Sequence, residues 1–203
     1  KLNDLLTYSS NLYKNQDYHL LNKDLQKELY DFFKDRFRYY LKEKEIRYDI
    51  IDASISSFSL NKLFSSFEKA KQLNKFIKHQ IGLDIISSYK RASNILESEI
   101  KNNNIEINNT TDPAIFKSEF EQKLFKKINE IKKYYESIDN DENYEKSLFI
   151  LAGAKKEVSE FFDNVKVNEE NETLRKNRLE LINMLCKTFQ NFINFQLLKT
   201  NNE

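Results

Sequence analysis

This 203-residue sequence contains two glycines, one proline, one cysteine, one methionine and no tryptophan. Two glycines exclude phosphate-cradling loops of the G-x-x-x-x-G-K-[ST] or G-x-G-x-x-G kind, and a β-rich chain normally uses more turn residues. A single cysteine permits no internal disulfide and no cysteine-based zinc site. No apolar run approaches the roughly 18 residues of a membrane span, and no signal-peptide pattern opens the chain. These absences predict a soluble, intracellular, all-α protein.

The residues that are abundant fit a helical core. The 16 phenylalanines and 11 tyrosines provide large side chains for burial, although only 39% of the residues are apolar. The 33 Lys and Arg residues nearly balance the 32 Asp and Glu residues, and the resulting net charge of +1 indicates no partner by itself. The chain begins at Lys1 and its only methionine is Met184, which indicates a piece of a longer polypeptide.

Apolar residues recur at helical spacing through most of the chain. The pattern predicts helices over about 2–14, 25–44, 46–58, 60–77, 83–101, 113–138, 144–162 and 172–198. Gly82 is predicted to end the fourth helix, and Asp112 with Pro113 to begin the sixth. The apolar pattern drifts out of heptad register in every helix, which favours a helical bundle over a coiled coil.

Residues that could carry catalysis or bind a metal ion are few. His19 and His79 are 60 residues apart, with no carboxylate cluster at metal-ligand spacing. Cys186 falls on the apolar arc of the last predicted helix, where a small buried hydrophobic residue is expected. The acidic run at 139–145 lacks the glycine and the spacing of a calcium loop. We therefore expect no catalytic residue and no metal site in this chain.

Two arginines occupy unusual positions in the last predicted helix. On a helical wheel of residues 172–198, Arg175 and Arg178 fall inside the apolar arc, close to the helix start where the dipole favours anions. One interpretation is that they extend out of the core or pair with a carboxylate such as Asp163. The other is that they reach an anionic or planar partner, as arginine does with phosphates and bases.

A second charge pattern lies in the middle of the chain. Between residues 60 and 96, seven Lys and Arg residues face only two acidic residues. Arg91 and Asn94 project away from the apolar face of their helix, and Lys90 lies at its edge. A basic helical stripe with an amide donor suits an RNA backbone and base edges, but lysine-rich solvated faces are also common.

Four motifs follow one another along the chain. They are F-R-Y-Y-L with I-R-Y-D-I-I-D-A at 37–53, Y-K-R-A-S-N-I-L at 89–96, F-F-D-N-V-K-V-N at 161–168, and L-R-K-N-R-L at 174–179. In this order they resemble the β subunit of bacterial glycyl-tRNA synthetase, over about residues 29–198. The last motif occurs in DALR-type anticodon-binding domains of several synthetases, whereas the third points to the glycyl β subunit. Departures are Tyr48, where the family has His, and E-V-S at 157–159, where it often has P-V-D.

The resemblance implies an all-α helical bundle, with a DALR-type anticodon-binding domain at 59–203 and the end of a preceding helical region at 1–58. It also implies recognition of the anticodon arm of glycine tRNA, as part of an ATP-dependent glycine–tRNA ligase. The fragment itself would be non-catalytic, because the α subunit carries the ATP and glycine chemistry. The implied partners are tRNA-Gly and that α subunit, in an α2β2 assembly of the bacterial cytoplasm. The fragment would hold no cofactor, since ATP and Mg²⁺ serve the whole enzyme.

The implied ligand suggests which side chains would bind it. The second and third anticodon bases of glycine tRNA are cytosines, and an unstacked cytosine presents O2 and N3 acceptors and an N4 donor. Arg or Asn can satisfy the acceptors, a carboxylate or backbone carbonyl the donor, and Lys or Arg the loop phosphates. For Asn94, Asn168 and Arg178, structural roles as caps or buried hydrogen-bond partners are the alternative. The RNA-binding candidates are Lys90, Arg91, Asn94, Lys166, Asn168, Arg175 and Arg178.

Two other functions fit the same sequence. One is a DALR domain of another aminoacyl-tRNA synthetase, against which the F-F-D-N-V-K-V-N motif counts. The other is a non-catalytic helical module that docks proteins through its apolar faces. Salt distinguishes these classes, because RNA binding weakens steeply as salt rises and apolar docking does not.

Overall fold

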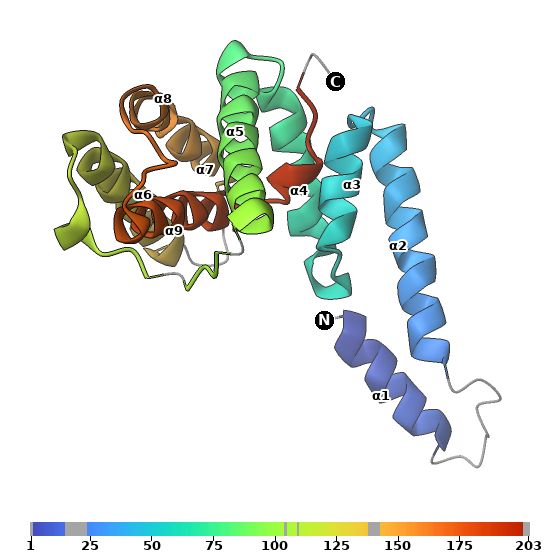
Figure 1. The fold of residues 1–203 in the computed structure, drawn as a ribbon. Coiled ribbons are helices and arrows are strands. Elements are labelled where there is room, and N and C mark those ends of the chain that lie inside the picture. The colour runs from blue at the N-terminus through green and yellow to red at the C-terminus, as the bar shows by residue number, and fades with distance from the viewer. Residues whose placement is uncertain (1, 15–23, 104, 109, 138–142, 201–203) are drawn as a thin grey trace.

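The described part of the protein is helical throughout. In a computed structural model, residues 2–14, 24–103, 105–108, 110–137 and 143–200 are described, and their regular elements are α-helices and short 3-10 helices (Figure 1). The prediction of an all-α fold is confirmed. In chain order the elements are α1 (Leu2–Lys14), α2 (Leu25–Glu43), α3 (Tyr48–Ser56), η1 (Leu60–Lys62), α4 (Leu63–Phe76), α5 (Gln80–Asn103), η2 (Pro113–Ile115), α6 (Glu119–Ser137), α7 (Tyr144–Ala152), α8 (Lys155–Asn164), α9 (Glu172–Gln190) and η3 (Phe195–Leu197).

The long helix α5 lies at the centre of the bundle. It packs against α7, α8, α9 and η3, and α6 in turn packs against α7, α8 and α9. Figure 1 shows α6, α7, α8 and α9 on one side of α5 and η3, α3 and α2 on the other, with α1 below α2 and α3. The two segments that carry the motifs at 89–96 and 161–168 are therefore brought together, since α5 contacts α8 directly.

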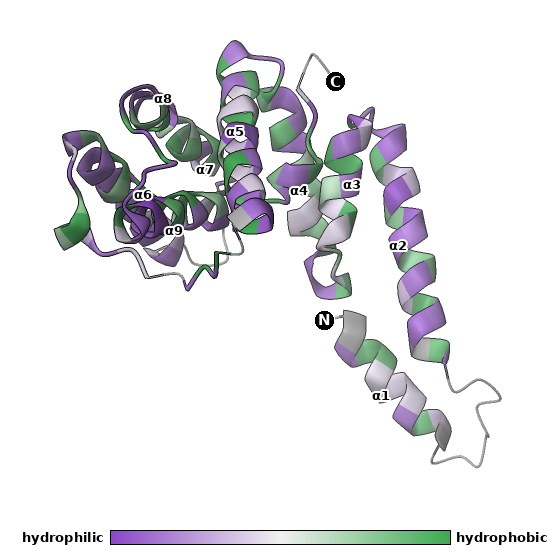
Figure 2. Cartoon of the chain, viewed as in Figure 1, coloured by the Kyte–Doolittle hydropathy of each residue, from purple (hydrophilic) through white to green (hydrophobic). Residues whose placement is uncertain are grey.

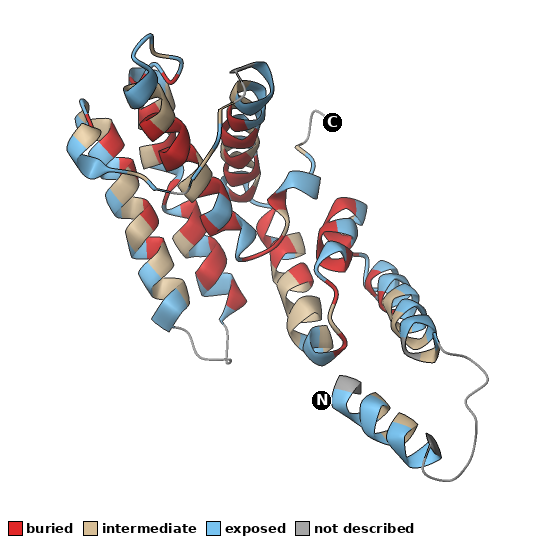
Figure 3. Cartoon of the chain, turned by 60° about the horizontal axis from the view of Figure 1, so that its bottom comes forward, coloured by how far each residue is buried: buried red, intermediate tan, exposed pale blue. Residues whose placement is uncertain are grey.

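Apolar side chains meet where the helices face one another. Buried residues concentrate in the helices around α5, whereas α1 is almost entirely exposed (Figure 3). Hydrophobic residues alternate with hydrophilic ones along the outer helices, and α2 shows this most clearly (Figure 2). An outer helix such as α2 therefore packs one apolar stripe against its neighbours and leaves the opposite one in water.

An aromatic cluster anchors α5 in this core. The Tyr89 ring is buried with its centroid 5.9 Å from that of Phe189 and 5.5 Å from that of Phe195. Burial raises the pKa of the Tyr89 hydroxyl, which accepts a hydrogen bond from Gln190 Nε2 at 3.0 Å. Tyr89, the first residue of the Y-K-R-A-S-N-I-L motif, thus has a packing role.

The same cluster explains why the last helix is shorter than predicted. The prediction ran it to residue 198, but α9 ends at Gln190, and a turn leads to η3. At about 100° per residue, Phe189 and Phe195 would point roughly 120° apart on one continuous helix. The turn lets both rings contact Tyr89, and it also buries Phe192, which lies outside the helix.

Two other predicted helices are divided in the structure. Asp112 accepts a hydrogen bond from Ala114 N at 2.9 Å, as an N-cap should, but only the 3-10 helix η2 follows it. The helix α6 starts at Glu119, because the Glu121 carboxylate accepts the backbone N–H groups of Lys117 at 2.9 Å and Ser118 at 2.7 Å. The predicted helix over 144–162 is two helices, α7 and α8, with a break at residues 153–154.

The segment that follows η3 is fastened to the start of α3. The Arg47 guanidinium donates from Nε to Asp49 Oδ1 at 2.6 Å and from Nη2 to Oδ2 at 2.5 Å. Lys199 donates its backbone N–H to Asp49 Oδ2 at 2.6 Å, and its carbonyl accepts from Arg47 Nη2 at 2.9 Å. The I-R-Y-D part of the first motif is therefore a clamp on residue 199.

This clamp makes the stability of the chain pH-dependent. Burial acts to raise the pKa of Asp49, but the hydrogen bonds from Arg47 and Lys199 and the Arg47 charge outweigh it, so the pKa is lowered below 3.8. A lowered carboxyl pKa stabilises the fold above the unfolded value of about 3.9, and this contribution is lost as pH falls through the folded value. We expect Asp49→Asn to lower the free energy of unfolding at pH 7 by about 2 kcal/mol, as for lost hydrogen bonds to a charged group.

Urea unfolding at pH 7 and at pH 3 measures this effect. The difference between wild type and Asp49→Asn should be smaller at pH 3, because this pH lies below the unfolded-state pKa of about 3.9, where the contribution of a lowered carboxyl pKa starts to be lost. The matched control is Asp52→Asn on the same helix, because Asp52 forms an exposed pair with Arg38 at 2.6 Å. An equally large Asp49→Asn effect at both pH values would contradict the ionised clamp.

Candidate nucleic-acid interface

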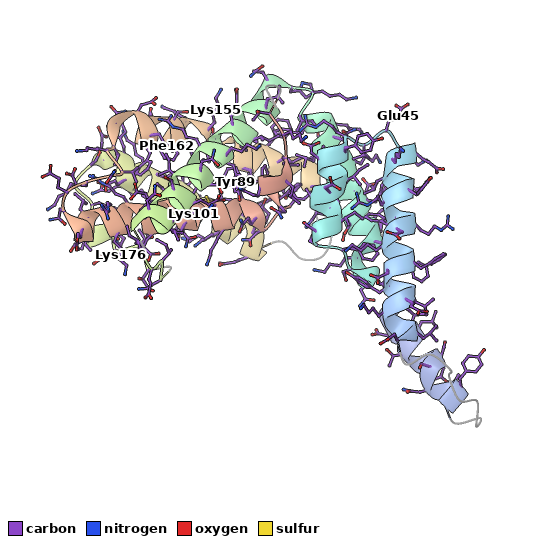
Figure 4. All side chains as sticks on the ribbon, turned by 45° about the vertical axis from the view of Figure 1, so that its right-hand side comes forward. Glu45, Tyr89, Lys101, Lys155, Phe162 and Lys176 are labelled. Atoms are coloured by element: carbon purple, nitrogen blue, oxygen red, sulfur yellow. The ribbon has the colours of Figure 1, made fainter. Side chains whose placement is uncertain are left out.

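A groove of about 430 Å³ lies between α5, the end of α8 and the connection that follows it. Its α5 wall consists of residues spaced i, i+3, i+4, i+7 and i+8, which share one helix face. Its other wall is formed by residues of the third motif, which begins at Phe161. One of them, Phe162, is labelled beside α5 in Figure 4. The lining residues are Arg91, Asn94, Ile95, Ser98, Glu99, Phe162, Val165, Val167 and Asn168.

The groove combines an apolar floor with polar edges. Val165 and Val167 are buried, and Ile95 and Phe162 are half-buried. Donors and acceptors surround these residues, and the volume lies within the roughly 300 to 1,000 Å³ typical of small-ligand sites. Apolar surface beside hydrogen-bonding groups is what a splayed-out nucleobase requires.

Arg91 lies at the mouth of the groove. Its guanidinium carbon is 4.8 Å from the centroid of the Phe162 ring, and Nη2 donates to the Phe162 carbonyl at 3.4 Å. Nη1 is 3.5 Å from Asp163 Oδ1, and both side chains of this pair are more than half exposed. A surface pair of this kind contributes at most about 1 kcal/mol, so Arg91 can exchange it for a phosphate or a base.

Arg175 is not part of the groove lining but contacts two residues that are. Its Nη1 donates to Asn168 Oδ1 at 3.4 Å, and its Nε is 3.9 Å from Glu99 Oε2. The Nε atom is buried and has no hydrogen-bond partner. Asp163, the carboxylate suggested from the sequence as a partner of the arginines in α9, pairs with Arg91 instead.

Arg178 holds the connection that forms one wall of the groove. It is buried, and its Nε donates to Glu121 Oε1 at 2.9 Å while Nη1 donates to the Lys166 carbonyl at 2.8 Å. Nη1 also lies 3.4 Å from Glu169 Oε2. These contacts match the structural role given as the alternative for Arg178, and they leave the Lys166 side chain exposed.

The remaining candidates divide by exposure. Asn94 and Asn168 line the groove from opposite walls and are exposed, whereas Lys90 is half-buried on α5 outside the lining. Asn177, which the sequence did not single out, accepts from Asp112 N at 2.8 Å and donates to the Asp112 carbonyl at 3.0 Å. The motif L-R-K-N-R-L therefore supplies one residue beside the groove and two that hold connections in place.

Glu99 is the functional candidate that the sequence analysis missed. Its side chain is 14% exposed and belongs to the groove lining. The signal was its position eight residues after Arg91, two helical turns along the same face. In the sequence, Glu99 stands close to other acidic and basic residues, so the pattern did not distinguish it from an ordinary solvent-exposed carboxylate.

Other reactive side chains are not assembled into a site. The described residues hold no group of three or more His, Cys, Asp or Glu that could bind a metal ion. His79 is exposed, and His19 falls outside the described residues. Cys186 is buried as predicted, and burial raises the pKa of its thiol to about 12, so it stays neutral. Over the described part of the chain, no helix is long and apolar enough to cross a membrane.

Comparison with known families assigns this arrangement to a class. The model of the DALR anticodon-binding domain matches residues 85–200, which is more than half of the chain and includes both walls of the groove. The chain therefore belongs to the DALR anticodon-binding domain family.

The relatives are more specific. Glycine–tRNA ligase β subunits of Rickettsia africae and Rickettsia peacockii are 32% and 33% identical over 97% of this chain. That of Cereibacter sphaeroides is 28% identical over 80% of it. The chain spans about a quarter of the length of these relatives (23% to 27%). The predicted homology to the C-terminal region of the glycine–tRNA ligase β subunit is confirmed.

Proposed function

We propose that the groove between α5 and the connection after α8 binds the anticodon arm of glycine tRNA. The observation that carries this proposal is that two motifs far apart in the sequence, at 89–96 and 161–168, form its opposite walls. Their apolar side chains make the floor, and Asn94 and Asn168 face the same space. Direct readout of RNA relies on this combination of stacking surface and base-edge hydrogen bonds.

The cationic candidates have separate roles in this proposal. Arg91 at the mouth contacts a loop phosphate or stacks on a base, as guanidinium groups do. Lys90 and Lys166 contribute positive charge on either side, and Arg175 orients Asn168 through their hydrogen bond. Arg178 acts indirectly, since its bond to the Lys166 carbonyl holds the connection against α9.

The proposal places this chain within a larger enzyme. It would be the tRNA-recognising part of a glycine–tRNA ligase β subunit, with an anticodon-binding domain at 59–203 and a preceding helical region at 1–58. Catalysis with ATP and Mg²⁺ would belong to the α subunit of an α2β2 assembly in the bacterial cytoplasm. A protein-docking module is the second candidate, and salt dependence separates the two.

Binding of a labelled anticodon hairpin of glycine tRNA, followed by fluorescence anisotropy, tests the function. We expect the hairpin with both anticodon cytosines to bind at least tenfold more tightly than one with uracils there, since each mismatched base costs about 1–3 kcal/mol. Raising the salt from about 50 to 200 mM should weaken both complexes but preserve their ratio.

Two arginine variants locate the binding. Arg91→Ala should weaken the cytosine hairpin several-fold, whereas Arg38→Ala, which removes a similarly exposed arginine from an ion pair on α2, should leave binding unchanged. Equal, salt-labile binding of both hairpins would reduce the site to a basic surface. Absence of RNA binding would refute the proposal for this chain.

A further inference from the structure

We infer that Glu99 distinguishes cytosine from uracil in the groove, an inference that rests on the proposed function. The two bases share O2 but differ at two positions of the pairing edge: cytosine carries an N4 amino group and an N3 acceptor, whereas uracil carries an O4 acceptor and an N3–H donor. An ionised carboxylate only accepts hydrogen bonds. Glu99 is the one carboxylate among the residues that line the groove, so it is the acceptor for the amino group.

The surroundings of Glu99 favour this role. Its side chain is 14% exposed, so it is largely shielded from competing water and the desolvated contact discriminates strongly. The Arg175 guanidinium, with Nε 3.9 Å from Glu99 Oε2, compensates the negative charge. The two oxygens of a carboxylate offer about four acceptor sites, so Glu99 can accept from a base amino group in addition to its other contacts.

The opposite wall supplies the complementary donors. Asn168 Oδ1 accepts from Arg175 Nη1 at 3.4 Å, which orients the amide so that Nδ2 presents its two N–H groups elsewhere. A cytosine between Glu99 and Asn168 would donate from its N4 amino group to Glu99 and accept from Asn168 Nδ2 at O2, an acceptor that uracil shares. Uracil in the same position would direct O4 at the Glu99 carboxylate, where two acceptors repel each other.

Arg175 connects the two contacts. The same guanidinium pairs with Glu99 on α5 and with Asn168 on the connection after α8. It therefore holds the Glu99 carboxylate and the Asn168 amide at a fixed distance from each other. We therefore treat Arg175 as a positioning residue and Glu99 as the residue that determines base specificity.

The test uses Glu99→Gln and four anticodon hairpins that carry cytosine or uracil at each of the two positions. Gln keeps the size of Glu but can donate to O4 as well as accept from N4. Wild type should prefer cytosine by about tenfold or more at each position, and Glu99→Gln should reduce this ratio to within about twofold at one of them. Glu97→Gln, an exposed residue of the same helix outside the groove lining, is the matched control and should keep both ratios.

A base analogue tests the same contact without changing the protein. Pyrimidin-2-one has neither the amino group nor O4, so wild type should bind it more weakly than cytosine and more tightly than uracil at the position that Glu99 reads. Cytosine preference that persists at both positions in Glu99→Gln, or uracil binding at least as tight as pyrimidin-2-one, would overturn the inference while leaving the proposed function intact. A wild-type chain without any cytosine preference would overturn both.

Discussion

Replacing Arg178 by alanine should lower the free energy of unfolding by about 3 to 5 kcal/mol, the usual cost of removing one partner of a buried ion pair. Glu121 is fully buried, and its Oε1 accepts from Arg178 Nε at 2.9 Å. Without the guanidinium, its negative charge would stay in the core, held only by the N–H groups of Lys117 and Ser118. Urea unfolding followed by circular dichroism measures the change.

Two further variants show whether the loss of stability comes from the unpaired buried charge of Glu121 or from removing any arginine. Arg91→Ala removes an exposed ion pair and should change stability by less than about 1 kcal/mol. The double variant Arg178→Met with Glu121→Gln removes both charges but keeps an oxygen that can accept from the Lys117 and Ser118 N–H groups, so it should recover part of the loss. An Arg178→Ala variant as stable as Arg91→Ala would show that the pair does not hold α6 to α9.

Replacing Gly82 by alanine should also destabilise the fold, by about 2 kcal/mol or more, as overpacking does in well-packed sites. Gly82 was predicted to end the fourth helix, but α4 ends at Phe76 and Gly82 lies in the first turn of α5. A Cβ atom there would be 2.4 Å from the Phe76 carbonyl oxygen and 2.8 Å from Ile77 Cα. These are backbone atoms, so no side chain can move aside, and the clash outweighs the helix propensity gained, about 1 kcal/mol.

Gly153→Ala is the matched control. A Cβ at this exposed position would be 3.2 Å from the Ile150 carbonyl oxygen, and the backbone at Gly153 is already helical. We expect its free energy of unfolding to stay within about 0.5 kcal/mol of wild type. Similar thermal and urea midpoints for the two glycine variants would contradict the close approach of α4 and α5 at Gly82.

Helical periodicity predicted the class of fold and the existence of most helices, but long-range contacts decided where several begin and end. The start of α6 depends on the buried Glu121, which caps the helix from inside and is itself held by Arg178, 57 residues away. The end of α9 depends on Tyr89, because Phe189 and Phe195 both contact its ring and a turn separates these two residues. Neither partner is near in the sequence, so local pattern could not identify it.

The groove could be predicted in part. Arg91 and Asn94 were identifiable because they project from an otherwise apolar helix, and both line the groove. Glu99 was not identifiable, since it shares the groove with Val165 and Val167, which are more than 60 residues away in the sequence. Arg175 and Arg178 looked equivalent on the helical wheel, yet one lies beside the groove and the other within the core.

The most direct test of the groove as the anticodon site is an NMR titration of the isotope-labelled chain with the cytosine-containing anticodon hairpin. We expect the largest amide shift changes at residues 91–99 and 162–168 and at Arg175, and much smaller changes with the uracil hairpin. Changes confined to α2 or α4, with no response along the groove, would contradict this expectation.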